Sequence, residues 1–202
     1  MSILRANRER LRQLLTRHSL MFGDFTLVSG RKSKFYFDSK KTTCLPEGSY
    51  LAAVEILRTI REHEIEAEAI GGMTLGADPL VCPVAALSHI EGPPLRAFIV
   101  RKATKGHGTE RRIEGNLEPG SRVIVVDDVV TTGGSTLSAV GAAEAAGHRV
   151  VAVLCLVDRE EGGADKLAAW PYYPLFRRHE IFDESSESRG GQGTTAKRTE
   201  ER

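Results

Sequence analysis

At 202 residues, the chain is long enough for one well-buried core and too short for two ordinary domains. Its 28 basic residues nearly balance its 27 acidic ones, which argues against bulk binding to nucleic acid or to an anionic membrane. Cys44, Cys82 and Cys155 lack the C-x-x-C pairing of metal sites, and no apolar run suits a membrane span or a signal peptide, so we expect a cytoplasmic protein with reduced thiols.

The N-terminal part is predicted to hold a surface helix, two extended segments and a second helix. Over residues 3–18 a single apolar stripe runs among Arg and Glu residues, and the simplest interpretation of the basic face is a solvated surface. Residues 25–38 indicate two extended pieces around Ser29-Gly30, whose aromatic side chains an ordinary hairpin would pack on the core. Pro46 stands near the first turn of a helix that runs to about His63.

A glycine-rich turn follows the first predicted strand of the main sheet, residues 67–70. The turn comprises residues 71–79 and leads into a helix from Leu80 to about His89. A strand that delivers glycines to a helix start can receive an anion, because the first N–H groups of a helix are unpaired. Glycines at such a junction are also often just a tight connection, so this turn alone does not decide between the two.

A basic segment follows the next buried strand, residues 95–100. Residues 101–115 contain Arg101, Lys102, Lys105 and His107, are punctuated by glycines and lack helical or strand periodicity. A solvated surface loop is the plain interpretation. The same features suit a lid that closes over a diphosphate, excludes water and neutralises the charge that develops there.

The longest motif begins with the β-branched run of residues 123–126, within a predicted strand over about 122–127, and such a run is typical of a strand buried on both faces. Asp127 and Asp128 end the run, a turn of hydroxyls and glycines follows, and a helix over 137–146 is predicted to stop at Gly147. Ionised carboxylates only accept hydrogen bonds, so the pair suits ribose hydroxyls or a hydrated Mg²⁺, and the turn suits a phosphate. No Walker-A loop and no G-x-G-x-x-G occurs, so the motif predicts a phosphorylated sugar, with a purely structural strand–turn–helix as the alternative.

A further buried strand, residues 149–157, places Arg159 at its carboxyl end. An Arg at that edge of a parallel sheet faces the ligand crevice and its planar fork suits a carboxylate, although a surface pair with Asp158 is the plain alternative. Residues 172–182 are predicted to form a closing strand pair near the 25–38 hairpin. Strands alternating with helices predict an α/β domain over 1–183 with a mostly parallel central sheet flanked by helices, and the polar stretch 184–202 predicts a disordered tail.

Four segments resemble one known family. Residues 123–136 resemble the PRPP-binding motif of type I phosphoribosyltransferases, a long and contiguous match. The pattern R-K-x-x-K-x-H-G over 101–108 resembles the catalytic loop of the orotate phosphoribosyltransferases, D-R-x-E-G over 158–162 resembles their orotate site, and residues 25–38 resemble their hood. The resemblance implies the type I phosphoribosyltransferase fold, with a small hood from about 20–40 plus the C-terminal strands.

The resemblance also implies an activity and a site. The activity is transfer of a phosphoribosyl group from PRPP to orotate, giving orotidine 5′-monophosphate and diphosphate in UMP synthesis. It implies Mg²⁺ bound mainly through PRPP, with no protein ligand assigned, and a homodimer that shares the 101–115 loop across its interface. The residues implied as catalytic are Lys105, His107, Asp127 and Asp128; those implied to bind PRPP are Gly72, Met73, Thr74, Arg101, Lys102, Lys105, His107, Asp127, Asp128, Val129, Val130, Thr131, Thr132, Gly133, Gly134 and Ser135; and those implied to bind orotate are Tyr36, Phe37, Thr131 and Arg159.

Two positions depart from the family pattern. Many relatives carry a Lys directly before the Ser-Gly of the hood and another in the glycine-rich turn after the first main-sheet strand, where this chain has Val28 and Leu75. At Val28 the contact is then missing or supplied elsewhere, and at Leu75 backbone N–H groups would have to do more of the binding.

Two other functions stay open at this point. A purine phosphoribosyltransferase would keep the chemistry, and only the 101–108 loop and Arg159 speak against it, because a neutral purine offers Arg159 no carboxylate. A PRPP-sensing regulator would usually add a DNA-binding helical domain, and the roughly 18 residues ahead of the hood are too few for a helix-turn-helix. We expect neither a nucleic-acid partner nor a membrane.

Overall fold

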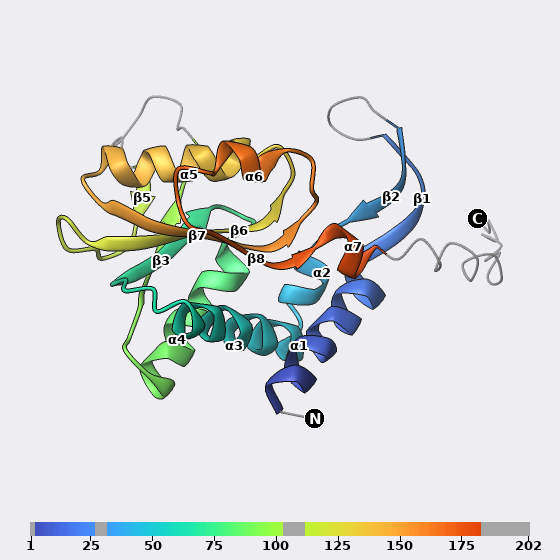
Figure 1. Cartoon of the computed structure of the whole chain (residues 1–202), viewed down its shortest axis with the longest axis horizontal. Coiled ribbons are helices and arrows are strands. Elements are labelled where there is room, and N and C mark those ends of the chain that lie inside the picture. The colour runs from blue at the N-terminus through green and yellow to red at the C-terminus, as the bar shows by residue number, and fades with distance from the viewer. Residues whose placement is uncertain (1–2, 27–31, 103–111, 183–202) are drawn as a thin grey trace, which may run out of the picture.

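The computed structural model describes residues 3–26, 32–102 and 112–182. It starts with helix α1 (Ile3–Leu14), a π-helical turn at Leu15–Ser19 and strands β1 (Leu20–Thr26) and β2 (Lys32–Phe37). The two strands pair antiparallel and form the hood, which stands beside the main body in Figure 1. The short helix α2 (Lys40–Thr43) and the long helix α3 (Pro46–Glu62) lead from the hood into that body.

Six strands form the central sheet in the spatial order β5-β4-β3-β6-β7-β8. Strands β3 (Ala69–Met73), β4 (Arg96–Val100), β6 (Arg122–Val130), β7 (Arg149–Asp158) and β8 (Tyr172–Arg177) are parallel, and β5 (Ile113–Glu114) is antiparallel to β4. Parallel neighbours require crossover connections, and helices α4 (Asp78–Glu91), α5 (Gly134–Ala145) and α6 (Gly163–Lys166) supply them. The predicted mostly parallel α/β sheet is confirmed.

Helices cover both faces of the sheet. Figure 1 shows α5 and α6 on one face and α3 and α4 on the other. Successive side chains of β6 enter the two cores in turn: Ile124 and Val126 pack on the α3 and α4 side, and Val123 and Val125 pack on the α5 side. Burial on both faces explains why this strand is a continuous apolar run rather than an alternating one. Among the described helices, none combines the length and apolar character needed to cross a bilayer.

Several element boundaries differ from those predicted. Strand β6 continues to Val130, so the two acids lie inside the strand, and α5 already begins at Gly134. The predicted C-terminal strand pair is wrong, because β8 joins the main sheet beside β7 and a helical turn, α7 (Arg178–Ile181), follows it. Glu180 accepts a hydrogen bond from the N–H of Arg177 at 2.8 Å and so caps this turn. The hood therefore consists of β1 and β2 without a C-terminal strand, and the predicted tail 184–202 lies outside the described residues.

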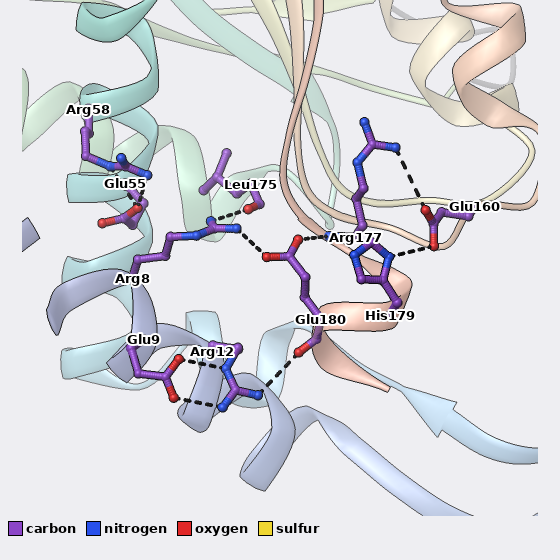
Figure 2. A network of polar contacts seen from close by, with 10 residues as sticks. All are labelled: Arg8, Glu9, Arg12, Glu55, Arg58, Glu160, Leu175, Arg177, His179 and Glu180. Atoms are coloured by element: carbon purple, nitrogen blue, oxygen red, sulfur yellow. Dashed lines mark hydrogen bonds and ion pairs between the residues drawn. The ribbon is translucent and has the colours of Figure 1, made fainter. Parts of the chain in front are cut away.

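Charged side chains tie α7 to α1, as Figure 2 shows. Arg8 donates to the carbonyl of Leu175 and, at 2.6 Å, to Glu180 Oε1. Arg12 donates to the carbonyl of Glu180 at 3.3 Å. The apolar stripe of α1 is confirmed by the burial of Leu11, but the interpretation of its basic face as merely solvated is wrong for these two arginines, because they hold the C-terminal turn in place.

Candidate active site

Asp127 is buried within β6 and holds the turn that follows the strand. Its Oδ2 accepts hydrogen bonds from Ser135 Oγ at 2.8 Å and Thr136 Oγ1 at 2.7 Å, and its Oδ1 accepts one from the N–H of Asp128 at 3.0 Å. Burial raises the pKa of Asp127 to about 6; the two hydroxyl donors oppose this rise, and the neighbouring carboxylate of Asp128 adds to it. Because both oxygens are engaged, Asp127 mainly fixes the first turn of α5.

Asp128 is partly buried at the point where three segments meet. Ser39 Oγ, just before α2, donates a hydrogen bond to Asp128 Oδ2. Gly76, in the turn after β3, approaches so closely that an added Cβ would lie 2.3 Å from Asp128 Oδ1. Asp128 therefore joins β6 both to the turn after β3 and to the end of the hood.

The turn after β6 presents a helix N-terminus. Gly133 adopts the left-handed conformation at φ +75°, which favours glycine, and α5 starts at the next residue. The first N–H groups of α5 have no partners within the helix, so they offer donors and a positive dipole end to an anion. Gly163 packs directly on this turn, because a Cβ there would lie 2.6 Å from the carbonyl oxygen of Thr131. The segment after Arg159 thus lies against the predicted phosphate turn.

Arg159 follows β7 and reaches toward the hood. Its N–H donates to the carbonyl of Val130 at 2.9 Å, which fixes its backbone beside β6. Its guanidinium lies 5.3 Å from the ring centroid of Phe35 in β2, and its Nη2 lies 2.8 Å from Glu161 Oε1. The side chain is only 14% exposed, so water shields its charge weakly. A planar fork held in this way can bind a carboxylate.

Comparison with known proteins identifies the family. A model of the phosphoribosyl transferase domain matches residues 87–174. An orotate phosphoribosyltransferase of Aquifex aeolicus (strain VF5) is 43% identical over 185 residues, which cover 89% of this chain and 100% of that protein. The chain belongs to the orotate phosphoribosyltransferase family. A second orotate phosphoribosyltransferase, from Thermosynechococcus vestitus, is 48% identical over 163 residues, which cover 80% of this chain and 85% of the relative.

Solved structures share the fold. Orotate phosphoribosyltransferase of Mycobacterium tuberculosis H37Rv in complex with Fe(III) dicitrate has a TM-score of 0.77 and 36% identity, over 87% of this chain and 99% of that one. The same protein in complex with PRPP has a TM-score of 0.73 and 33% identity, over 87% of this chain and 98% of that one. An adenine phosphoribosyltransferase from Leishmania donovani, at 20% identity and a TM-score of 0.64 over 91% of this chain and 86% of that one, shares the fold alone.

In this member of the orotate phosphoribosyltransferase family, the turn after β3 differs from expectation. Gly72 lies inside β3, where an added Cβ would lie 1.9 Å from the carbonyl oxygen of Val126, so this glycine serves the packing of the sheet. Met73 is 7% exposed and belongs to the core. Thr74 stands at the strand end with its hydroxyl on Asp78 Oδ2 at 2.7 Å. The PRPP contacts expected for Gly72, Met73 and Thr74 stay predictions, and Gly76, which was not among the expected site residues, meets Asp128 in the same turn.

The hood brings Phe35, rather than Phe37, toward Arg159. Alternation along β2 sets Phe35 and Phe37 on one face and Tyr36 on the other. Phe37 is 8% exposed and packs on Phe182, with ring centroids 5.4 Å apart, so it belongs to the core. Tyr36 is 42% exposed. The Phe-Tyr-Phe run contained this pattern, but the sequence did not tell which ring would meet the arginine.

The structure describes one of the two positions at which many relatives carry a Lys. Leu75, in the turn after β3, is 71% exposed. Val28 lies outside the described residues. The turn that meets Asp128 therefore carries a large apolar side chain, Leu75, on the surface.

A backbone hydrogen bond joins the two ends of the 101–115 segment. The N–H of Arg101 donates to the carbonyl of Arg112 at 2.8 Å, and Arg101 Nη1 lies 2.9 Å from Glu114 Oε1. The pairing of β5 with β4 begins there, so the far end of the segment is a short strand. Arg101 and Lys102 are exposed. Lys105 and His107 lie outside the described residues, and their roles stay predictions.

A cavity of about 740 Å³ lies at the opposite edge of the sheet. Its lining mixes apolar side chains such as Leu57, Ile60 and Leu95 with charged ones such as Arg122. The carboxyl edge instead gathers Asp128, the α5 N-terminus and Arg159. Parallel α/β sheets bind ligands at that edge, so we place the active site there.

Proposed function

We propose that this chain transfers the phosphoribosyl group of PRPP to orotate, forming orotidine 5′-monophosphate and releasing diphosphate in the synthesis of UMP. The observation that carries this function is the convergence of an acidic side chain, a helix N-terminus and a shielded arginine at one sheet edge. Asp128, the turn before α5 and Arg159 are joined there through Gly163 and Val130. Membership of the orotate phosphoribosyltransferase family supports orotate as the acceptor.

The 5′-phosphate binds in the turn after β6. The hydroxyls and N–H groups of Thr131–Ser135 and the dipole of α5 supply donors to an anion. Asp128 accepts from the ribose hydroxyls, because its carboxylate lies at the junction of the turn after β3, the hood and β6. Asp127 fixes the start of α5 in this arrangement, because it accepts hydrogen bonds from the hydroxyls of Ser135 and Thr136.

Orotate binds between Arg159 and the hood. The planar fork of Arg159 pairs with the carboxylate of orotate. Thr131 helps to orient the base, because it directly follows Val130, whose carbonyl accepts the N–H of Arg159. Phe35, whose ring lies near the guanidinium, borders this place, and the contacts of Tyr36 and Phe37 with orotate stay predictions. A flat anionic base suits both the aromatic surface and the cation.

The reaction is a displacement at the anomeric carbon. The bond from this carbon to a diphosphate oxygen breaks, and a ring nitrogen of orotate, which gives up its proton, forms the new bond. Negative charge grows on the departing diphosphate while the sugar takes oxocarbenium character. Arg101, Lys102, Lys105 and His107 screen that charge, and the enzyme otherwise acts by holding the reactants in line.

We propose that Mg²⁺ is held mainly by PRPP, as the resemblance to the family implies. Among the residues that the structure describes, no group of three or more His, Cys, Asp or Glu side chains could hold a metal ion. Asp127 accepts three hydrogen bonds, whereas Asp128 accepts one from a described side chain, that of Ser39, so Asp128 has more acceptor capacity left for a hydrated ion. Mg²⁺ would supply positive charge next to the diphosphate.

We also propose a cytoplasmic homodimer in which the 101–115 loop of one protomer reaches the site of its partner. The resemblance to the family supports the shared loop, and the exposed Arg101 and Lys102 at its base are free of the core. Free thiols at Cys44, Cys82 and Cys155 suit a reducing compartment.

The test is to follow the near-ultraviolet absorbance of orotate with PRPP and Mg²⁺, with hypoxanthine and adenine as alternative acceptors. We expect orotate to be consumed only when PRPP is present and both purines to be inert. Turnover of a purine with inert orotate would refute the assignment of the base and leave the fold intact.

A further inference from the structure

Arg159 already has an acidic partner in its own turn. Glu161 Oε1 lies 2.8 Å from Arg159 Nη2, and the two side chains are 29% and 14% exposed. One face of the guanidinium is covered by the ring of Phe35, and its Nε is buried without a hydrogen-bond partner among the described groups. An intramolecular carboxylate therefore occupies part of the fork that the proposed function reserves for orotate.

We propose that Glu161 is a built-in competitor for the carboxylate of the substrate, which it mimics at Arg159 while the site is empty. A guanidinium shielded from water is costly without a counter-ion. Glu161 supplies that counter-ion in the empty site. A carboxylated base can take its place and keep the arginine paired, whereas a neutral base that displaced Glu161 would leave the charge unpaired. This inference rests on the proposed function, because it requires Arg159 to bind the carboxylate of orotate.

Glu161, rather than Arg159, is the partner that can move. Arg159 is fixed by its backbone bond to Val130 and by its contact with Phe35. Glu161 is the more exposed of the two and stands next to Gly162, which adopts φ +86° at the start of a glycine pair. Its carboxylate can therefore turn to water when the substrate arrives, where hydration compensates for the lost pair.

The adjacent residue provides a matched control. Glu160 carries the same charge but faces the C-terminal turn, where its Oε2 lies 3.4 Å from His179 Nδ1 and its Oε1 lies 3.9 Å from Arg177 Nη1 (Figure 2). Its side chain has no described contact with Arg159. Removing the charge of Glu160 changes the net charge of the turn as much as removing that of Glu161, but it leaves the fork of Arg159 occupied.

The experiment compares Glu161→Gln and Glu160→Gln with the unsubstituted enzyme in steady-state assays with orotate, PRPP and Mg²⁺. We expect Glu161→Gln to lower the KM for orotate about fivefold, the equivalent of the roughly 1 kcal/mol that a partly exposed ion pair contributes. The KM for PRPP should not change, which also verifies that the variant is folded. Uracil, which lacks the carboxylate, should inhibit Glu161→Gln and the unsubstituted enzyme equally. Glu160→Gln should leave the KM for orotate unchanged.

Three results would overturn the inference. An unchanged or raised KM for orotate in Glu161→Gln would mean that Glu161 orients the arginine instead of competing for it. An equal fall in both variants would mean a general charge effect, and a parallel gain for uracil would remove the link to the carboxylate. Failure of the unsubstituted enzyme to consume orotate would refute the proposed function instead, and calorimetric dissociation constants for orotate would then decide whether Glu161 competes.

Discussion

The raised pKa of Asp127 predicts that this residue limits the stability of the protein at neutral pH. Burial raises the pKa of its carboxyl group from the ordinary 3.8 to about 6, and such a rise corresponds to about 3 kcal/mol. Between these two pH values the folded state keeps a proton that the unfolded state has released. The free energy of unfolding therefore falls as the pH rises through this window, and the penalty stays constant above about pH 6.

The variant Asp127→Asn removes this titration and keeps the local hydrogen bonds. The amide oxygen can accept from the N–H of Asp128, and the amide N–H groups can donate to the hydroxyl oxygens of Ser135 and Thr136. We expect the variant to match the parent near pH 4 and to be more stable by about 1–3 kcal/mol at pH 7.5. The higher figure applies if the folded protein does not relax around the charge.

Urea unfolding at several pH values from 4 to 8, followed by circular dichroism, measures the difference directly. The diagnostic result is a difference in the free energy of unfolding between the two proteins that grows between pH 4 and pH 6 and is constant above pH 6. A gap that is the same at every pH, or a variant that is less stable at pH 7.5, would show that the burial of this carboxylate is not what raises its pKa.

Three further substitutions test the site. Gly163→Ala should raise the KM for PRPP about tenfold, because its Cβ would lie 2.6 Å from the carbonyl oxygen of Thr131 and would displace the phosphate turn; Gly141→Ala, whose Cβ meets nothing within 4 Å, is the control and should leave PRPP kinetics unchanged. Arg159→Glu should raise the KM for orotate by about 100-fold or more, through loss of one ion pair and gain of a repulsion, and an unchanged value would count against the orotate pocket. Lys105→Ala should reduce kcat much more than the affinity for PRPP measured by calorimetry, and an equal loss of both would contradict a role confined to the transition state.

The sequence was sufficient for the parts of the site that local pattern controls. The uninterrupted β-branched run of β6 required burial on both faces, and alternation with helices then required a parallel sheet. Once the strands are parallel, residues that follow them meet at one edge, which brought Asp128 and Arg159 together as expected. Gly133 marked the turn because few other residues suit its left-handed backbone.

Contacts between distant segments were beyond the reach of such patterns. Ser39, which lies 89 residues earlier in the chain, donates a hydrogen bond to Asp128, and Gly76 approaches the same carboxylate from another turn. Ser39 belongs to no motif, and Gly76 lies in the glycine-rich turn 71–79 without any sign that it would meet Asp128. The nearness of Phe35 to Arg159 has the same origin, since Phe35 and Phe37 lie on one face of β2, both pack on Phe182, and only the tertiary structure brings Arg159 to the first of them.

By itself, the sequence determined the α/β order, the carboxyl edge as the place of chemistry, and the types of side chain that gather there. Those properties follow from hydrophobic periodicity and backbone preference, which act over a few residues. Only the tertiary structure decided that Asp127 is buried with a raised pKa, that Glu161 occupies the fork of Arg159, and that Arg8 anchors the C-terminal turn. Burial and ion pairing depend on which segments come together in space, and that information is spread over the whole chain.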